Sequence, residues 1–408
     1  MTTATVLDSR ALPASAPTSA KAVFALLRRL RHGTLDVQLP DGEQMRFGTG
    51  LSTEPQASMR MLNWRVCSAA LRSGDIGFAE GYIAGDWTTG DLVGLLELLV
   101  ANRDAIDQAV YGRWWGSLWH RVRHLLHRNS RAGSRRNIHA HYDLGNAFYR
   151  LWLDESMNYS SAWFEGDLTR PMRGAQDAKM RRALAECQVT ADSRVLEIGC
   201  GWGALAECAT RDFGARVTGV TLSAEQLAFG RERLAQAGLA DRADLRFQDY
   251  RDIDDGPYDA IVSIEMFEAV GREYWAGYFD TLRRQLRPGG RACIQSITIR
   301  DDLFARYVGG TDFIQQYIFP GGLLPSPSAF RAEAARAGLR VVNELAFGPD
   351  YAETLRRWRV SFLHREAQVR TLGFDTRFMR IWEFYLAYCE AAFAAGNTDV
   401  MQFTLVRD

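Results

Sequence analysis

Two acidic side chains, Glu265 and Glu268, lie within the apolar stretch SIEMFEAVG at residues 263–271. No histidine and no lysine accompanies them there. A carboxylate in a dry site can take up a proton or hold a charged ligand, because burial raises its affinity for protons. An acid in such a run more often caps a helix or forms an ion pair, and we favour that role for Glu265, although it could also contact a bound cofactor. Glu268 is the stronger candidate for chemistry, for a motif given below.

A glycine-rich turn in VLEIGCGWG, residues 195–203, is the second candidate site. The pattern predicts a buried strand, a turn and the start of a helix. Gly199 and Gly201 let the backbone approach a ligand, and the helix offers unpaired N–H groups. The glycine spacing is not that of a dinucleotide fingerprint. The sequence E-x-G-x-G-x-G in this setting resembles motif I of class I methyltransferases that use S-adenosylmethionine (SAM).

The second predicted strand departs from that class. Class I methyltransferases usually end this strand with an acid that holds the cofactor ribose. Here ARVTGVTLSAEQ, residues 215–226, presents Thr221 and Leu222, with Gln226 soon after. Either the chain is a methyltransferase of an unusual kind, or other polar groups hold the ribose.

The elements that position these residues alternate between strand and helix. Four short apolar runs, SRVLEIG, ARVTGVT, DAIVSI and RACIQSITI, are separated by helical stretches such as SAEQLAFGRERLAQAG. This alternation predicts a parallel α/β sheet with helices on both faces. MQFTLVR, residues 401–407, is a closing strand in this interpretation. Trp382, Phe384, Tyr385 and Tyr388 would pack a helix over the sheet or line an acyl tunnel.

The chain before residue 139 has a different organisation. Residues 1–20 are predicted to be a disordered tail, residues 20–33 a short basic helix and residues 35–48, around Pro-Asp-Gly, a hairpin. Between residues 113 and 137, arginines and tryptophans occur without any acid. A helix here would carry an apolar stripe beside its arginines, which suits either an anionic membrane surface or packing on the first domain. Gly and Ser at residues 129–138 indicate a domain boundary. We divide the chain into a lipid- or membrane-association domain at residues 21–128, a basic linker at residues 129–138 and a catalytic domain at residues 139–408.

Length, net charge and cysteine content limit the class of protein further. A chain of 408 residues is too long for one ordinary core. Its formal net charge is zero, so no nucleic-acid partner is expected. The six cysteines form no CxxC pair, which argues against a zinc site or a disulfide framework. No signal peptide or membrane-spanning run is present, and we expect a cytoplasmic protein at the inner face of the membrane.

Four stretches, in the same order along the chain as in a known family, indicate which methyltransferase family the sequence resembles. They are HYDLGNAFYRLWLDESMNYSSAWF, GVTLSAEQ, DYRDIDDGPYDAIVSIEMFEAVG and YIFPGGLLPS. In this order they resemble the cyclopropane-fatty-acyl-phospholipid synthases, relatives of the mycolic acid cyclopropane synthases and methyltransferases. The resemblance implies a class I Rossmann-like sheet with helical lid insertions, a smaller N-terminal mixed α/β domain and a homodimer.

The resemblance also implies a reaction. The family transfers a methyl group from SAM to the cis double bond of an unsaturated phospholipid acyl chain. A carbocation forms, and loss of a proton closes a cyclopropane. The base is implied to be a bound bicarbonate ion in a dry pocket.

Residues carry over by motif. Glu268 matches the glutamate of the bicarbonate site, Tyr351 its tyrosine and Ile297 a residue whose backbone lies in it. Ser161 stands where the family has cysteine, and Gln295 where it has histidine. For the cofactor the matching residues are Tyr159, Ser160, Gly199, Gly201, Thr221, Leu222, Gln226, Asp249 and Tyr250.

The two replacements leave the product open. Serine and glutamine still donate hydrogen bonds, but neither titrates near neutral pH. We expect a cyclopropane, with a methyl-branched or methylene-bearing chain as the rival. A catalytically silent lipid-binding protein and a methyltransferase of soluble acceptors are the alternatives of other classes.

Overall fold

The computed structural model describes residues 12–110 and 144–408, and the chain folds into two compact units. The first contains the N-terminal residues together with Gly310–Ile318 and Gly373–Ala395. The second contains Phe319–Leu372, Gly396–Asp408 and the central part of the chain up to Gly309. Two segments of the predicted catalytic region therefore belong to the first unit. The predicted linker and the arginine–tryptophan segment lie outside the described residues.

The first unit is built on a mixed four-stranded sheet. Its order is β2 (Gln44–Gly48), β1 (Thr34–Gln38), β3 (Gln56–Met61) and β4 (Trp87–Thr88). β1 and β2 form the antiparallel hairpin that Pro-Asp-Gly predicted, while β1 and β3 are parallel. The helices are α1 (Thr18–Leu27), α2 (Arg65–Ala84), α3 (Leu92–Ala101), α4 (Arg103–Val110), α13 (Phe313–Tyr317) and α17 (Thr376–Ala394). Helix α1 begins within the segment expected to be a disordered tail.

The aromatic run of α17 packs inside the first unit. The Phe384 ring lies 5.8 Å from Tyr82 of α2 and 4.9 Å from Phe313 of α13, between centroids. The predicted packing of this helix over the catalytic sheet is wrong. An amphipathic aromatic stripe fits any apolar partner, and the partners of α17 are far away in sequence, so the stripe alone could not identify them.

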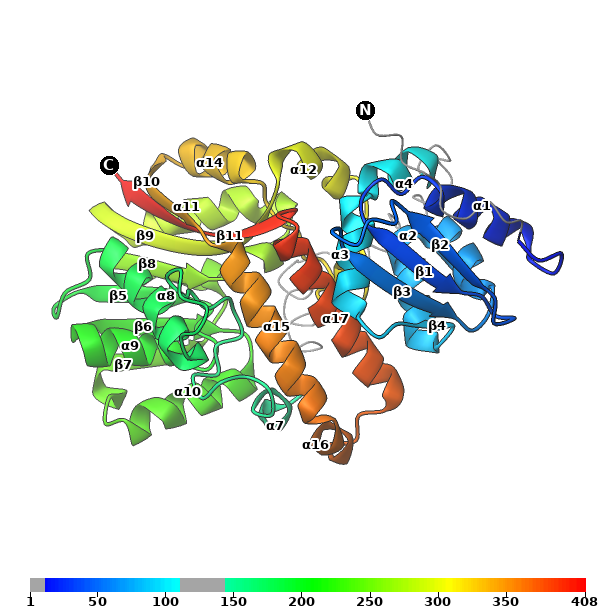
Figure 1. Cartoon of the computed structure of the whole chain (residues 1–408). Helices are drawn as coiled ribbons and strands as arrows, with labels where there is room; N and C mark the ends of the chain where they lie inside the picture. Colours follow the sequence, from blue (N-terminus) through cyan, green and yellow to red (C-terminus); the bar gives the residue numbers. More distant parts are fainter. Residues whose placement is uncertain (1–11, 111–143) are drawn as a thin grey trace. The chain divides into compact units, whose positions relative to one another are not determined.

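The second unit contains a seven-stranded sheet (Figure 1). Its order is β10 (Leu339–Ala346), β11 (Thr398–Arg407), β9 (Leu286–Ile299), β8 (Tyr258–Ile264), β5 (Arg194–Ile198), β6 (Arg216–Thr221) and β7 (Ala243–Phe247). Strands β5 to β9 pair in parallel, whereas β11 is antiparallel to both β9 and β10. This confirms the predicted α/β class and the closing strand.

Alternate residues of each strand point to opposite faces, and each face has its own core. Leu196 of β5 and Ile261 of β8 pack with α11 (Trp275–Gln285) and α14 (Pro327–Arg336). Val195 and Val262 pack with helices on the other face. These helices are α8 (Met172–Glu186), α9 (Ala204–Phe213) and α10 (Ala224–Gln236).

The remaining elements are short or lie outside these two layers. They are α7 (Asn146–Tyr149), α12 (Asp301–Val308), α15 (Gly348–His364), α16 (Glu366–Thr371) and the 3-10 turns η1 (Ala240–Arg242), η2 (Tyr250–Asp252), η3 (Phe267–Ala269) and η4 (Arg272–Tyr274). Within the described ranges, no helix has the length and apolar character needed to cross a membrane.

Candidate active site

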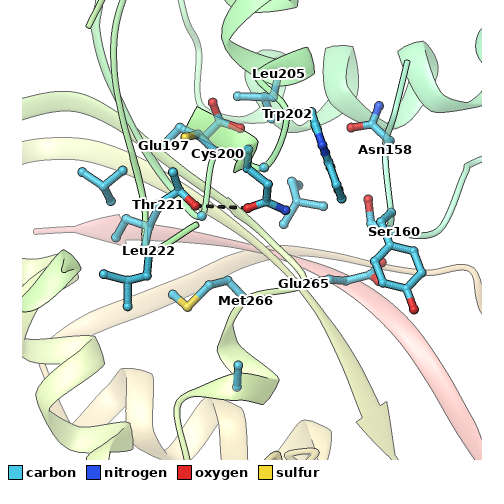
Figure 2. Close-up of a pocket in the computed structure, with 18 of the residues that line it drawn as sticks. Asn158, Ser160, Glu197, Cys200, Trp202, Leu205, Thr221, Leu222, Glu265 and Met266 are labelled. Carbon is cyan, nitrogen blue, oxygen red and sulfur yellow. Dashed lines mark hydrogen bonds between the residues drawn. The ribbon is translucent and has the colours of Figure 1, made fainter. Parts of the chain in front are cut away.

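A cavity lies at the carboxyl ends of β5, β6 and β8, where the order of the parallel strands reverses. Ligands of open α/β sheets bind at this kind of switch point. Figure 2 shows Glu197, Thr221 and Leu222 on one side of the cavity and Ser160 with Glu265 on the other. The glycine turn after β5 lines it as well. Gly199 has φ +85°, and a Cβ there would lie 3.0 Å from Cγ of Met266, so this position needs glycine.

The end of β6 offers neutral polar groups where the class usually has an acid. The Thr221 hydroxyl donates to Oε1 of Gln226 (3.1 Å). Ser223 caps α10 by accepting from the Gln226 N–H (3.3 Å), which fixes the glutamine beside the strand end. A hydroxyl and an amide can both donate to and accept from ribose hydroxyls.

Glu197 contributes a buried carboxyl group to the cavity wall. Burial raises the pKa of its carboxyl well above the usual value, and a hydrogen bond from the Ala206 backbone opposes that rise. Its Oε2 has no hydrogen-bond partner among the described residues. A buried acceptor without a partner is costly unless a ligand supplies a donor. The ammonium group of SAM is such a donor, so the donor and acceptor set fits this cofactor.

A second group of polar residues meets at Glu265, the residue that follows β8. Its Oε1 accepts from the Ser161 backbone N–H (2.9 Å) and from Nε2 of Gln295 (2.7 Å). Its Oε2 accepts from the Tyr351 hydroxyl (2.8 Å). The Ser161 hydroxyl instead donates to the Ala162 carbonyl (2.9 Å). The serine side chain therefore has no direct part in this cluster, which makes the loss of cysteine at this position less consequential than the sequence suggested.

A row of side-chain amides fixes Gln295 as a donor to Glu265. Gln295 pairs with Gln402 across β9 and β11. Arg182 can only donate, and it donates to Oε1 of Gln402 (2.6 Å). Nε2 of Gln402 then donates to Oε1 of Gln295 (3.0 Å), which leaves Nε2 of Gln295 for Glu265. The row thus favours a charged carboxylate at its end.

Lys179 of α8 supplies the opposite charge. Its ammonium group is buried and donates to Oγ of Ser160. Burial lowers its pKa to about 8, against the attraction of Glu265 and Asp154. Burial raises the pKa of Glu265, and Lys179 is the largest opposing influence. At neutral pH the lysine is mostly charged and favours ionised Glu265.

Glu268 has a separate environment. It accepts from the Ile297 backbone N–H, and its Oε2 has no partner among the described residues. Burial, together with repulsion from Glu265, raises its pKa to about 8. Two neighbouring buried carboxyls most easily carry one negative charge between them. Here the hydrogen-bond donors and Lys179 favour that charge on Glu265, so Glu268 is the neutral member of the pair.

Comparison with known proteins identifies the family. The family model of mycolic acid cyclopropane synthetase matches residues 129–403. The chain is 42% identical over 346 residues to the tuberculostearic acid methyltransferase UfaA1 of Mycobacterium tuberculosis, covering 83% of this chain and 80% of that protein. The chain belongs to the mycolic acid cyclopropane synthetase family.

Further relatives agree with this placement. The chain is 30% identical over 364 residues to the cyclopropane-fatty-acyl-phospholipid synthase of Escherichia coli K12, covering 89% of this chain and 91% of that enzyme. The crystal structure of mycolic acid cyclopropane synthase CmaA1 with SAH and CTAB superposes with a TM-score of 0.62 at 32% identity, over 66% of this chain and 97% of that one. The class I fold is confirmed, and this member of the synthetase family is a SAM-dependent methyltransferase.

The residues predicted from the sequence occupy two adjoining places in this synthetase-family member. All predicted cofactor residues except Asp249 line the cavity, whereas the Asp249 carboxylate pairs with Arg251 (2.6 Å). Ser161, Gln295 and Tyr351 meet at Glu265, and Ile297 meets Glu268. The capping or ion-paired role preferred for Glu265 underestimated it, since Glu265 also lines the cavity.

Sequence reasoning missed Lys179, Gln402 and Arg182. One signal was available for the first: Lys179 and Lys21 are the only lysines among 49 basic residues. A lysine kept in an otherwise arginine-rich chain suggests a site where a compact ammonium group fits and a guanidinium does not.

Bicarbonate does not fit the donor set of this member of the family. Two donors expected to hold it, the Gln295 amide and the Tyr351 hydroxyl, already donate to Glu265, and the Ser161 hydroxyl donates to the Ala162 carbonyl. The anion would have to displace a carboxylate of the same charge in a buried site, which repulsion and desolvation both oppose. No step of the reaction is therefore assigned to bicarbonate here.

Replacing Glu268 by glutamine tests the charge assignment. Protonated Glu268 keeps its proton in the folded protein, while the unfolded chain loses it above pH 4.5. The folded state binds more protons between pH 4.5 and about 8, so the free energy of unfolding falls as pH rises through this range. In Glu268→Gln this fall should be smaller by roughly 2–4 kcal/mol, with SAM affinity unchanged. Urea unfolding at a series of pH values measures it; an unaltered pH dependence would contradict a neutral Glu268.

Proposed function

We propose that the protein transfers the methyl group of SAM to the cis double bond of an unsaturated acyl chain carried on a phospholipid. The observation that carries the proposal is the carboxylate of Glu265 at the wall of the SAM cavity, held by three donors. Methylation of an alkene leaves a carbocation that must lose a proton. A base beside the cofactor, in surroundings that exclude water, is what this reaction requires.

Aromatic rings support the same proposal. Tyr159 lines the cavity, and its ring lies 5.5 Å from both Trp152 and Trp358, between centroids. The Tyr351 ring lies 6.2 Å from Trp358. Aromatic faces attract cations and offer no nucleophile that would trap one. An alkene is a poor nucleophile, and such a cage would hold it close to the methyl donor.

Two products are compatible with this site. The sequence predicted a cyclopropane, and the similarity to the Escherichia coli synthase supports it. The greater identity to a tuberculostearic acid methyltransferase supports a methylene-bearing chain, which is the product we favour. A saturated methyl branch would also need a reductant. Both the ring and the methylene group require loss of a proton from the transferred carbon.

Lipids from cells that express the protein test this function. We expect unsaturated acyl chains to gain one CH₂ in mass spectra, and proton NMR to show the signals of a terminal =CH₂ group on a branched chain carbon. Upfield ring signals would instead support the cyclopropane. A lipid profile identical to that of cells carrying an empty vector would contradict the function.

Access to the lipid is part of the proposal. The protein would act at the cytoplasmic face of the membrane, on an anionic surface, as a homodimer. Support comes from the sequence, in which arginines and tryptophans occur without acids between residues 113 and 137. Clustered arginines attract anionic lipid by about 1 kcal/mol each near the surface.

Replacing Arg121, Arg123 and Arg128 together by serine should weaken binding to anionic vesicles by about tenfold or more, because each arginine adds attraction. The loss should shrink as salt rises, since salt screens the attraction that remains in the parent. Cosedimentation with vesicles of mixed anionic and zwitterionic phospholipids at two salt concentrations measures this. Vesicle binding equal to the parent at low salt would assign the segment to packing within the protein.

A further inference from the structure

The carboxylate of Glu265 takes the place expected for an external anion. The backbone of Ser161 and the side chains of Gln295 and Tyr351 all donate to it, at 2.7 to 2.9 Å. We propose that Glu265 is the resident base of the reaction, and that this enzyme works without bicarbonate. The inference rests on the proposed function and names the group that accepts the proton.

Hydrogen-bond capacity identifies the reacting atom. A carboxylate oxygen has two lone pairs in the plane of the group. Oε1 accepts two hydrogen bonds, from Ser161 and Gln295, and is therefore filled. Oε2 accepts one, from Tyr351, and keeps a second lone pair among the described residues. Oε2 is the atom that takes the proton.

The backbone at Glu265 is strained in a way that places this side chain. Its φ is +48°, a conformation that side-chain-bearing residues rarely adopt. Its N–H donates to the Gln295 carbonyl (2.8 Å), which extends the β8–β9 pairing by one residue. The chain then turns into η3, and the side chain is directed to the cavity. Strain of this kind costs about 1 kcal/mol or more and concentrates at functional positions.

The groups around Glu265 keep its carboxylate ionised before the reaction. They also let the protonated acid release its proton afterwards. Lys179 faces it with a positive charge, and the amide row from Arg182 through Gln402 presents a fixed donor. Glu268 is the nearby acid that stays neutral at pH 7. Of the pair Glu265 and Glu268, the negative charge is thus confined to Glu265, which lines the cavity.

The step balances without another reactant. The π electrons of the alkene form a bond to the methyl carbon as its C–S bond breaks, leaving a neutral thioether and a cation on the acyl chain. A proton on the transferred carbon moves to Oε2 of Glu265. The electron pair of that C–H bond closes a ring, or forms a methylene double bond after a hydride shift along the chain. The neutral acid returns its proton to water when the product leaves.

Two variants of Glu265 test the inference with unsaturated phospholipid vesicles. Glu265→Gln keeps the shape and removes the base, and should lower turnover by about 10²-fold or more with SAM affinity within about threefold of the parent. Glu265→Gly relieves the strained φ and empties the site, so added bicarbonate or formate should restore part of its turnover. Removing dissolved bicarbonate should leave the turnover of the parent enzyme unchanged.

A matched control is Glu165→Gly. Glu165 is exposed and also has a left-handed backbone, φ +57°, so this variant shares the change in backbone freedom and should keep parental turnover. Glu265→Gln turnover within about threefold of the parent, or parental turnover that falls when bicarbonate is removed, would overturn the inference. No methyl transfer by the parent enzyme to any unsaturated lipid would instead defeat the proposed function, so the two failures are distinguishable.

Discussion

Lys179→Met should lower turnover at pH 7 by about tenfold or more and make the remaining activity rise with pH. Lys179 is the largest influence that opposes the raised pKa of Glu265. Without it that pKa rises further, so less of Glu265 is ionised at pH 7 and more of it becomes ionised as the pH increases. Methionine has similar length, and removing a buried charge together with its desolvation cost need not destabilise the fold.

The measurement is turnover against pH at saturating SAM, with thermal unfolding in parallel. Lys21→Met is the control, because Lys21 is the other lysine of the chain and is exposed. A uniform loss of activity at all pH values, with a lowered Tm, would show a structural role only. That result would contradict the electrostatic role assigned to Lys179.

Gly199→Ala should weaken SAM binding by about tenfold or more. The new Cβ would meet Cγ of Met266 at 3.0 Å and its Cβ at 3.1 Å. Met266 lines the cavity, so it would have to move into the space that the cofactor needs. Alanine at φ +85° also costs about 1 kcal/mol or more.

Calorimetric titration with SAM measures this effect. Gly238→Ala serves as the control, since Gly238 also has a positive φ (+70°) and no atom lies within 4 Å of its added Cβ. The control should lose stability but bind SAM like the parent. Equal affinities in all three proteins would contradict the placement of the cofactor at the glycine turn.

The architecture of the catalytic unit followed from local sequence patterns. Strand and helix alternate regularly after residue 190, and the glycine turn sits at the end of the first parallel strand, so the sheet class and the place of the cavity could both be predicted. At Asp249 the sequence did not identify the correct lining residue. Gln248 and Tyr250 line the cavity, whereas Asp249 turns to Arg251, and a short irregular segment has no periodicity from which to choose among neighbours.

The exchange of roles between Glu265 and Glu268 could not be read from the sequence. Both acids lie in one apolar stretch, and the left-handed backbone at Glu265 decides which of them lines the cavity. The amide row also depends on the strand register that places Gln295 of β9 opposite Gln402 of β11, and these two strands are distant in the chain. Long-range pairing of this kind leaves no local pattern. The association of α17 with the first unit escaped prediction for the same reason.

The most direct test is transfer from SAM that carries a trideuterated methyl group, with vesicles of unsaturated and of saturated phospholipids. We expect label in the unsaturated acyl chains alone, with two of the three deuterium atoms retained, because one leaves for Glu265. No label in any unsaturated chain, or products that keep all three deuterium atoms, would contradict it.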